Sequence, residues 1–131
     1  MEMLLTYRKL VKSEDLNPAG RLFGGRMMEW IDEAAAMYAI CQLQTQKIVT
    51  LKVSEILFKE PIYNGDIIEF FASTKNCGRT SFTVSLEVKR KAVAFNEKPK
   101  LALTCDLVFV TVDDNGKPIP NRFHSATPAK K

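Results

Sequence analysis

The residues best suited to chemistry lie between Asn17 and Asp32, where turn-forming residues lead into an apolar helix. The Gly24-Gly25 pair frees the backbone for unusual dihedral angles or for close approach to a ligand. Free N–H groups and the positive end of the dipole converge at a helix N-terminus, which suits an anion or a developing oxyanion. Asp32 follows two helical turns later. Glycine amides followed by a carboxylate are compatible with acyl transfer.

Asp32 stands out because of the helix face on which it falls. At about 100° per residue, Arg26, Glu29 and Glu33 share one narrow polar arc, where exposed ion pairs are expected. Asp32 instead aligns with an apolar stripe that includes Met28. A carboxylate on such a face costs free energy unless it is paired or used. Two interpretations therefore stay open: a structural acid bonded to backbone or lysine, and a catalytic acid.

The elements that must position these groups are one long helix and an antiparallel sheet. The helix is expected from Arg26 to Leu43, because this segment is rich in helix-forming residues. Strands are predicted over residues 4–12, 48–60, 67–75, 82–89 and 101–110. A change of phase in the second of these predicts a bulge near Ser54 and Glu55. Since one sheet face buries only one side of the helix, a second subunit is expected to cover the rest.

Length and composition limit the function classes. A chain of 131 residues forms one domain, predicted over residues 1–120, with a basic, flexible C-terminal tail over 121–131. No apolar run approaches the roughly 20 residues of a membrane span, and the N-terminus does not resemble a signal peptide. The formal charge of +4 is too weak to argue for nucleic acid. We therefore expect neither a nucleic-acid nor a membrane partner.

The chemistry open to the chain is also narrow. Cys41, Cys77 and Cys105 have neither disulfide nor zinc spacing, which suits a reducing cytoplasm. His124 is the only histidine and lies in a proline-rich segment, which argues against a Ser-His-Asp or Cys-His triad. No cluster has metal-ligand spacing, and no glycine-rich loop has a nucleotide-binding pattern, so no metal or cofactor is expected. Carboxylate-driven acyl transfer remains.

The same residues resemble a known family. The pattern Asn-x-x-Gly-x-x-Phe-Gly-Gly, followed by Asp seven residues later, is similar to that of the hotdog-fold acyl-CoA thioesterases. This chain carries it as Asn17, Gly20, Phe23, Gly24, Gly25 and Asp32. Asp15 and the segments 30–35, 48–51 and 58–66 are similar too. The resemblance extends to about Pro118, and the basic residues after Asn121 depart from it.

The resemblance implies an α+β hotdog fold, in which an antiparallel sheet wraps around the long central helix. It also implies a homodimer with a continuous sheet, often assembled into a trimer of dimers, with sites between subunits. Asp32 of one chain would then face the glycine loop of the other. In such a site Asp32 acts as general base or nucleophile, Asn17 orients water or holds the thioester carbonyl, and Gly24 and Gly25 form the oxyanion site.

Substrate contacts follow from the same resemblance. Arg79, Thr80 and Ser81 correspond to a segment that contacts the nucleotide or pantetheine of coenzyme A. Phe23 either walls the acyl channel or is a core aromatic residue. The run at 89–91 is expected to be a solvated strand end more than a phosphate site.

The sequence thus predicts a cytoplasmic acyl-CoA thioesterase that releases free acid and coenzyme A. The alternative is a non-catalytic acyl-CoA-binding or sensing module of the same fold. The sequence leaves five matters open: the acyl chain length, dimer against hexamer, the base or nucleophile role of Asp32, regulation by nucleotides, and which basic residues hold the phosphates of coenzyme A.

Overall fold

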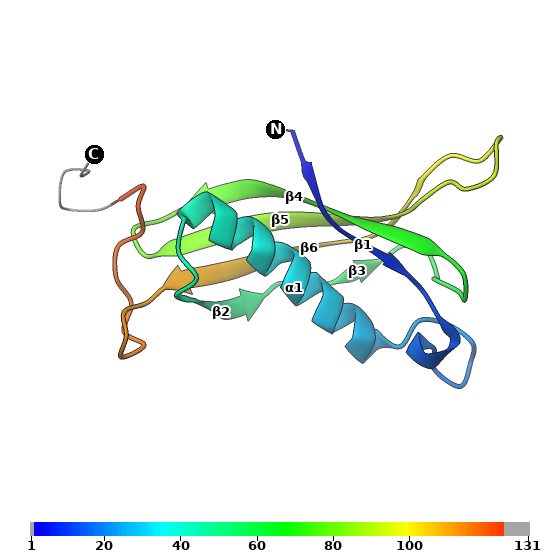
Figure 1. Cartoon of the computed structure of the whole chain (residues 1–131), viewed down its shortest axis with the longest axis horizontal. Helices are drawn as coiled ribbons and strands as arrows, with labels where there is room; N and C mark the ends of the chain where they lie inside the picture. The colour runs from blue at the N-terminus through cyan, green and yellow to red at the C-terminus, as the bar shows by residue number, and fades with distance from the viewer. Residues whose placement is uncertain (1, 125–131) are drawn as a thin grey trace.

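The computed structural model describes residues 2–124 and lays one long helix across one face of an antiparallel sheet (Figure 1). The elements in chain order are β1 (Leu4–Leu10), the short 3-10 helix η1 (Ser13–Asp15), α1 (Gly24–Leu43), β2 (Ile48–Val53), β3 (Leu57–Phe58), β4 (Ile67–Cys77), β5 (Ser81–Arg90) and β6 (Lys100–Thr111). The strands lie in the order β1-β4-β5-β6-β2, and β3 pairs with β6. This arrangement confirms the predicted α+β class with a long central helix.

The core forms where the period-two face of the sheet meets the alanine-rich face of α1. The inward residues of β5 are at most 1% exposed: Phe82, Val84, Leu86 and Val88. Ala34, Ala35 and Ala39 of the helix are fully buried, and such small side chains let the helix axis lie close to the sheet. Each large buried side chain contributes about 1.5–3 kcal/mol, so this layer holds the helix in place.

Two element boundaries differ from the sequence prediction. The helix begins at Gly24 instead of Arg26 and ends at Leu43. Its C-cap residue Gln44, with a φ of 57°, supplies the left-handed cap that no glycine provides. The predicted strand over 48–60 is divided into β2 and β3, both paired with β6. The irregularity expected near Ser54 is this division, and a further register shift lies between Thr50 and Lys52.

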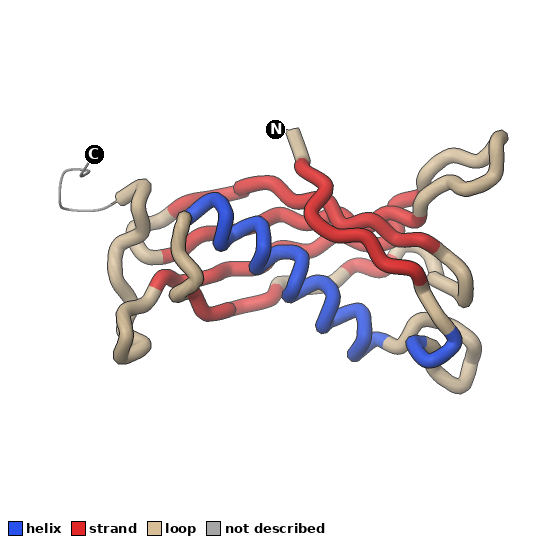
Figure 2. The backbone as a smooth tube through the Cα atoms, viewed as in Figure 1, coloured by secondary structure: helices blue, strands red, loops and turns tan. Residues whose placement is uncertain are grey.

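One flank of the helix stays uncovered within the chain. β2 is an edge strand, and Figure 2 shows α1 crossing the sheet obliquely between the β1 and β2 edges. Val49 and Leu51 on β2 are 47% and 66% exposed, and Met28 on the helix is 40% exposed. An apolar flank beside an unpaired strand edge is typical of a surface that meets another copy.

The last described residues pack against the domain. Asn121 is 2% exposed, and its backbone N–H donates to Arg79 O over 2.9 Å. The Phe123 ring stacks on Phe82 at 6.3 Å between centroids. The tail predicted from residue 121 is therefore fixed to the sheet as far as His124, and the remainder of that tail, residues 125–131, lies outside the described residues. Within residues 2–124 no helix is long and apolar enough to cross a membrane.

Candidate active site

Asn17 shapes the loop that precedes the helix. Its side-chain Oδ1 accepts hydrogen bonds from the backbone N–H groups of Ala19 and Arg21, at 2.9 and 3.2 Å. Its backbone N–H donates to Arg21 O over 2.7 Å, which closes the loop. Gly20 takes a φ of 82°, a conformation that favours glycine. Within residues 2–124 the Asn17 Nδ2 makes no hydrogen bond, so this amide is free to donate to a ligand.

Asp15 fixes where the loop enters the helix, a role for which the sequence analysis offered only a family resemblance. Its carboxylate is 5% exposed and accepts the Lys12 N–H over 2.9 Å. The Asp15 carbonyl accepts the Phe23 N–H over 2.8 Å, and Arg26 Nε lies 3.1 Å from its Oδ1. These contacts tie both sides of the loop to one buried acid, which orients the first helical turn.

The first turn of α1 presents unpaired amides. Phe23 occupies the N-cap without a side-chain cap, and in the described part of the chain the N–H groups of Gly24 and Gly25 have no acceptor. A Cβ at Gly24 would meet nothing within 4 Å, whereas one at Gly25 would lie 2.7 Å from Phe23 Cε2. Phe23 is 55% exposed and folds over this turn, so it is not a core residue. The first turn thus offers donors to an anion.

Asp32 is exposed within one chain and faces the β2 edge. Thr50 Oγ1 donates a hydrogen bond to Asp32 Oδ1 over 2.9 Å, which holds the carboxylate against the uncovered flank. Thr50 is not among the site residues predicted from the sequence. The signal for it was the segment 48–51, which resembles the family as a block but whose individual side chains were not weighed.

The two neighbouring acids of the helix are engaged elsewhere. Arg26 Nη1 lies 3.3 Å from Glu29 Oε1, which confirms the ion pair expected on the polar arc. Glu33 accepts a hydrogen bond from the Tyr7 hydroxyl over 2.8 Å. Burial, and then the nearby Glu33 carboxylate, raise the pKa of Tyr7 above its ordinary value of 10.0. Glu29 and Glu33 therefore both make surface contacts, and Asp32 is the better candidate for a catalytic acid.

The helix amides and Asp32 are too far apart to serve one reacting carbonyl within a chain. From Gly24 to Asp32 the helix rises about 12 Å, at 1.5 Å per residue. A cleft of about 360 Å³ opens beside the loop, and its lining includes Asn17, Met27 and Phe58 but not Asp32. The chain therefore groups Asn17 with the first helical turn and holds Asp32 apart.

The turn between β4 and β5 lies at the other end of the sheet (Figure 2). Asn121 Nδ2 donates to Gly78 O and Ser81 O, at 3.0 and 3.2 Å. The Thr111 N–H donates to Thr80 O over 3.0 Å. Every carbonyl of the turn from Gly78 to Ser81 is thus held inward, and the Arg79 side chain is exposed. One chain does not bring this turn to the Asn17 loop.

Three cysteine thiols complete the inventory of reactive groups. Cys41 is exposed, and Cys105 is buried. Burial, and then the nearby Asp106 charge, raise the pKa of Cys105 to about 12. Burial also raises the pKa of Cys77, although the Asn121 side chain and Arg122 oppose that shift. Neither Cys77 nor Cys105 is suited to act as a nucleophile at neutral pH.

In the described part of the chain, no group of three His, Cys, Asp or Glu side chains could hold a metal ion. At the end of β5, Lys89 lies over the Phe71 ring at 5.1 Å from its centroid and 4.0 Å from Glu87. Lys89 therefore makes its contacts on the sheet surface, and the expectation for the run at 89–91 remains a prediction.

A loop amide, helix amides and a separate carboxylate are groups that can serve acyl transfer, and comparison with known proteins gives the family of the chain. The family model of the thioesterase superfamily matches residues 19–94. The acyl-CoA thioester hydrolase YciA of Salmonella typhimurium is 32% identical over 119 residues, which are 88% of this chain and 88% of the relative. The chain belongs to the thioesterase superfamily.

Solved structures are similar over nearly the whole chain. A hexameric hotdog fold thioesterase of Campylobacter jejuni is 30% identical, with a TM-score of 0.79, over 91% of this chain and 90% of that one. The fold is thus the predicted hotdog fold. An acyl-CoA hydrolase from Staphylococcus aureus, solved with butyryl coenzyme A, coenzyme A and coenzyme A disulfide, is 35% identical, with a TM-score of 0.81, over 88% of this chain and 69% of that one.

Variants of the Staphylococcus aureus hydrolase have been characterised in which one threonine, one asparagine or one aspartate is changed to alanine. The changed asparagine and aspartate of that chain are separated by as many residues as Asn17 and Asp32 are here.

Proposed function

We propose that the protein hydrolyses the thioester of acyl-coenzyme A to a free carboxylic acid and coenzyme A. The observation that carries the proposal is Asp32, a carboxylate held by Thr50 on an uncovered apolar flank with no structural partner of opposite charge among residues 2–124. The acyl-CoA hydrolases that the chain resembles support the substrate class. Thr50 is proposed to be a positioning residue, because its hydroxyl donates a hydrogen bond to the Asp32 carboxylate.

The site is proposed to lie between two copies of the chain. Asp32 and exposed Met28 of the helix lie beside the β2 edge, which carries exposed Val49 and Leu51, and a two-fold axis beside β2 would bury both copies of this edge at once. Such pairing brings Asp32 of one copy toward the Asn17 loop of the other, which removes the roughly 12 Å separation within a chain. The hexameric relative from Campylobacter jejuni supports a further assembly of three such dimers.

In this site the groups have complementary tasks. Asp32 either takes a proton from water, whose oxygen attacks the thioester carbon, or attacks that carbon itself to form an anhydride that water then hydrolyses. In both routes the carbonyl oxygen gains negative charge, which the Gly24 and Gly25 amides and the Asn17 Nδ2 would stabilise. The C–S bond then breaks, and coenzyme A leaves as a thiolate that takes up a proton.

Recognition of coenzyme A is assigned to the turn between β4 and β5. Its carbonyls face inward, so exposed Arg79 and the outer surface at Thr80 and Ser81 are proposed to meet the nucleotide or pantetheine. Phe23, exposed beside the helix amides, is proposed to wall the acyl channel. The catalytic domain is proposed to span residues 1–120, with Asn121–His124 packed against it. A cytoplasmic location is proposed as well, with which three free thiols are compatible.

A non-catalytic acyl-CoA sensor is the second candidate, and turnover separates the two. Release of free thiol from short to long acyl-CoAs should be clear for the wild type and roughly 100-fold slower for Asp32→Asn, with coenzyme A binding retained. The Glu29→Gln variant is the matched control and should keep wild-type turnover. Binding without turnover by the wild type would favour the sensor, and full activity of Asp32→Asn would overturn the site assignment.

A further inference from the structure

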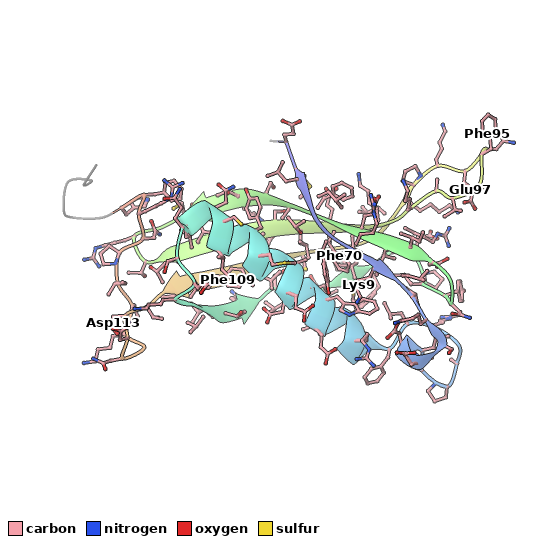
Figure 3. The ribbon with its side chains drawn as sticks, viewed as in Figure 1. Lys9, Phe70, Phe95, Glu97, Phe109 and Asp113 are labelled. Atoms are coloured by element: carbon pink, nitrogen blue, oxygen red, sulfur yellow. The ribbon has the colours of Figure 1, made fainter. Side chains whose placement is uncertain are left out.

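The loop between β5 and β6 extends beyond the sheet and exposes apolar side chains at its tip. Figure 1 shows this segment, residues 91–99, projecting past the end of the strands. Phe95 is 100% exposed and Val93 is 68% exposed, and Figure 3 places Phe95 at the outermost point of the loop. The loop leaves the end of the sheet that also carries the Asn17 loop, since Lys91 N–H donates to Ile67 O. Phe95 and Val93 thus give this short loop an exposed apolar tip.

The loop is closed by its own acid, which holds the tip in shape. Glu97 Oε1 accepts the N–H groups of Val93 and Ala94, both at 3.3 Å. Glu97 N–H donates back to Ala94 O over 3.1 Å. The carboxylate therefore faces the loop backbone, and the apolar side chains at positions 93 and 95 remain on the outside. A tip preset in this way loses little conformational freedom when it meets a partner.

The segment that carries this tip is strongly basic. Residues 89–100 contain five basic residues and one acidic residue, a net charge of +4 that equals the formal charge of all 131 residues. The basic residues beside the tip are Arg90, Lys91, Lys98 and Lys100. Within residues 2–124 these four side chains form no ion pair, so their charge faces outward. An apolar tip with a basic collar fits a surface that is apolar inside and negatively charged outside.

We propose that the loop over residues 91–99 docks the protein on an anionic lipid surface, with Phe95 and Val93 entering the interface and the basic collar meeting the headgroups. The expectation of no membrane partner rested on the lack of a spanning segment, which surface docking does not require. The inference is independent of the proposed function, because none of these residues is assigned to the catalytic groups.

Lipid fits this surface better than another copy of the chain or a nucleic acid. A second copy brings the same net charge of +4, and like charges repel when two such loops meet. A second copy of the chain can instead bind the apolar flank beside β2, which lacks this concentration of charge. A nucleic acid would use the basic residues but not a protruding aliphatic and aromatic pair, since stacking needs a platform of rings along a groove.

The test is co-sedimentation of the full chain with phosphatidylcholine vesicles, with and without about one third phosphatidylglycerol. The wild type should bind the anionic vesicles and not the neutral ones. Phe95→Ser should weaken binding roughly tenfold, because the apolar contact is lost. Lys98→Gln and Lys100→Gln should each weaken it about fivefold. Lys117→Gln should not, since this exposed lysine lies in a turn beyond the other end of β6.

Each of the other outcomes would overturn the proposal. If the wild type and Phe95→Ser bind vesicles equally, or if the wild type does not bind, the loop does not contact lipid as proposed. A change in molar mass of Phe95→Ser by light scattering would assign the loop to contact between copies. If coenzyme A at constant ionic strength releases the protein from vesicles, the basic residues bind the substrate instead of lipid. If the protein binds a single-stranded oligonucleotide as tightly as it binds the anionic vesicles, the basic residues bind nucleic acid instead. Turnover of a short-chain acyl-CoA without vesicles should be the same in all variants.

Discussion

The two ends of the sheet differ in how their backbone groups are satisfied. At the end where α1 begins, the Gly24 and Gly25 amides and the Asn17 Nδ2 have no acceptor within residues 2–124, and a cleft of about 360 Å³ lies beside them. At the end where α1 finishes, Asn121 and Thr111 engage every carbonyl of the turn between β4 and β5.

The difference separates a site that needs another molecule from a site that is already formed. Unpaired donors at a helix terminus gain most when an anion or developing oxyanion reaches them. Satisfied carbonyls fix the shape of a turn before a ligand arrives, which lowers the entropy lost on binding. We therefore assign bond cleavage to the open end and substrate grip to the closed end, each contributed by a different copy of the chain.

The largest expected effect is at the open end, in Asn17→Asp. The new side chain keeps the oxygen that accepts from Ala19 and Arg21, so the loop should persist. It lacks the amide donor and adds negative charge beside the proposed oxyanion. We expect kcat to fall roughly 100-fold, as for loss of one oxyanion donor, with an unchanged Tm. Steady-state kinetics and thermal unfolding measure both, and a kcat close to that of the wild type would remove Asn17 from the site.

At the closed end, Asn121→Ala should act through stability and binding. The change leaves Gly78 O without its donor and removes one of the two donors to Ser81 O, which still accepts the Gly78 N–H over 2.9 Å. It should cost about 1–3 kcal/mol of unfolding free energy. The loosened turn should raise KM for acyl-CoA severalfold at nearly constant kcat. Asn115→Ala, in an exposed turn, is the control for both readouts. A large loss of kcat in Asn121→Ala would contradict the division of tasks between the two ends.

Gly24→Ala should separate activity from stability. Within one chain the added methyl group meets nothing within 4 Å, and alanine favours a helix by up to about 1 kcal/mol over glycine. The variant should thus fold at least as well as the wild type. We expect its kcat/KM to fall about tenfold, because the proposed thioester approaches this turn closely. Gly25→Ala, where the methyl group meets the Phe23 ring, is the comparison, and unchanged kinetics of Gly24→Ala would place the substrate elsewhere.

The smallest effect should be seen in thiol labelling. Cys77, whose pKa is raised by burial, should react slowly at pH 8, whereas exposed Cys41 reacts first. Asn121→Ala should speed labelling of Cys77 a few-fold by exposing it. Cys105, with a pKa of about 12, should stay unreactive in the native state. Mass spectrometry of alkylated peptides identifies each site, and an unchanged Cys77 rate would mean that Asn121 does not hold this end closed.

The Cys105 thiol also gives a pH dependence with a definite sign. Its pKa is raised from 9.0 unfolded to about 12 folded, so the unfolded chain loses its proton first. The stability it contributes is complete below pH 9 and is lost as pH rises toward 12. Urea unfolding of Cys105→Ala and wild type across this range should therefore show a steeper loss in the wild type. Parallel curves would show that the thiol is not buried in the folded state.

What could be predicted from the sequence follows from how local each signal is. The helix, its apolar face and the β5 alternation are local patterns, and the structure confirms them. The bond from Thr50 to Asp32 joins residues that are 18 positions apart, and the contacts of Asn121 with Ser81 and Gly78 join residues that are 40 and 43 positions apart. Such pairs depend on sheet register, which periodicity leaves undetermined.

The exposure of Asp32 shows the same limit. The helical wheel correctly separated it from Glu29 and Glu33, but the wheel describes only one element. Whether the flank beside Asp32 is covered depends on the second copy, and a sequence pattern for one chain does not describe that contact.

The most direct test of a shared site is to mix two inactive variants. Asp32→Asn and Asn17→Asp are each expected to lose nearly all turnover, and they are unfolded and refolded together in equal amounts. If each site joins Asp32 of one copy to Asn17 of the other, mixed dimers contain one intact site, and the mixture should recover about a quarter of wild-type activity. If both groups act within one chain, the mixture should remain as inactive as its components, and that result would contradict the account.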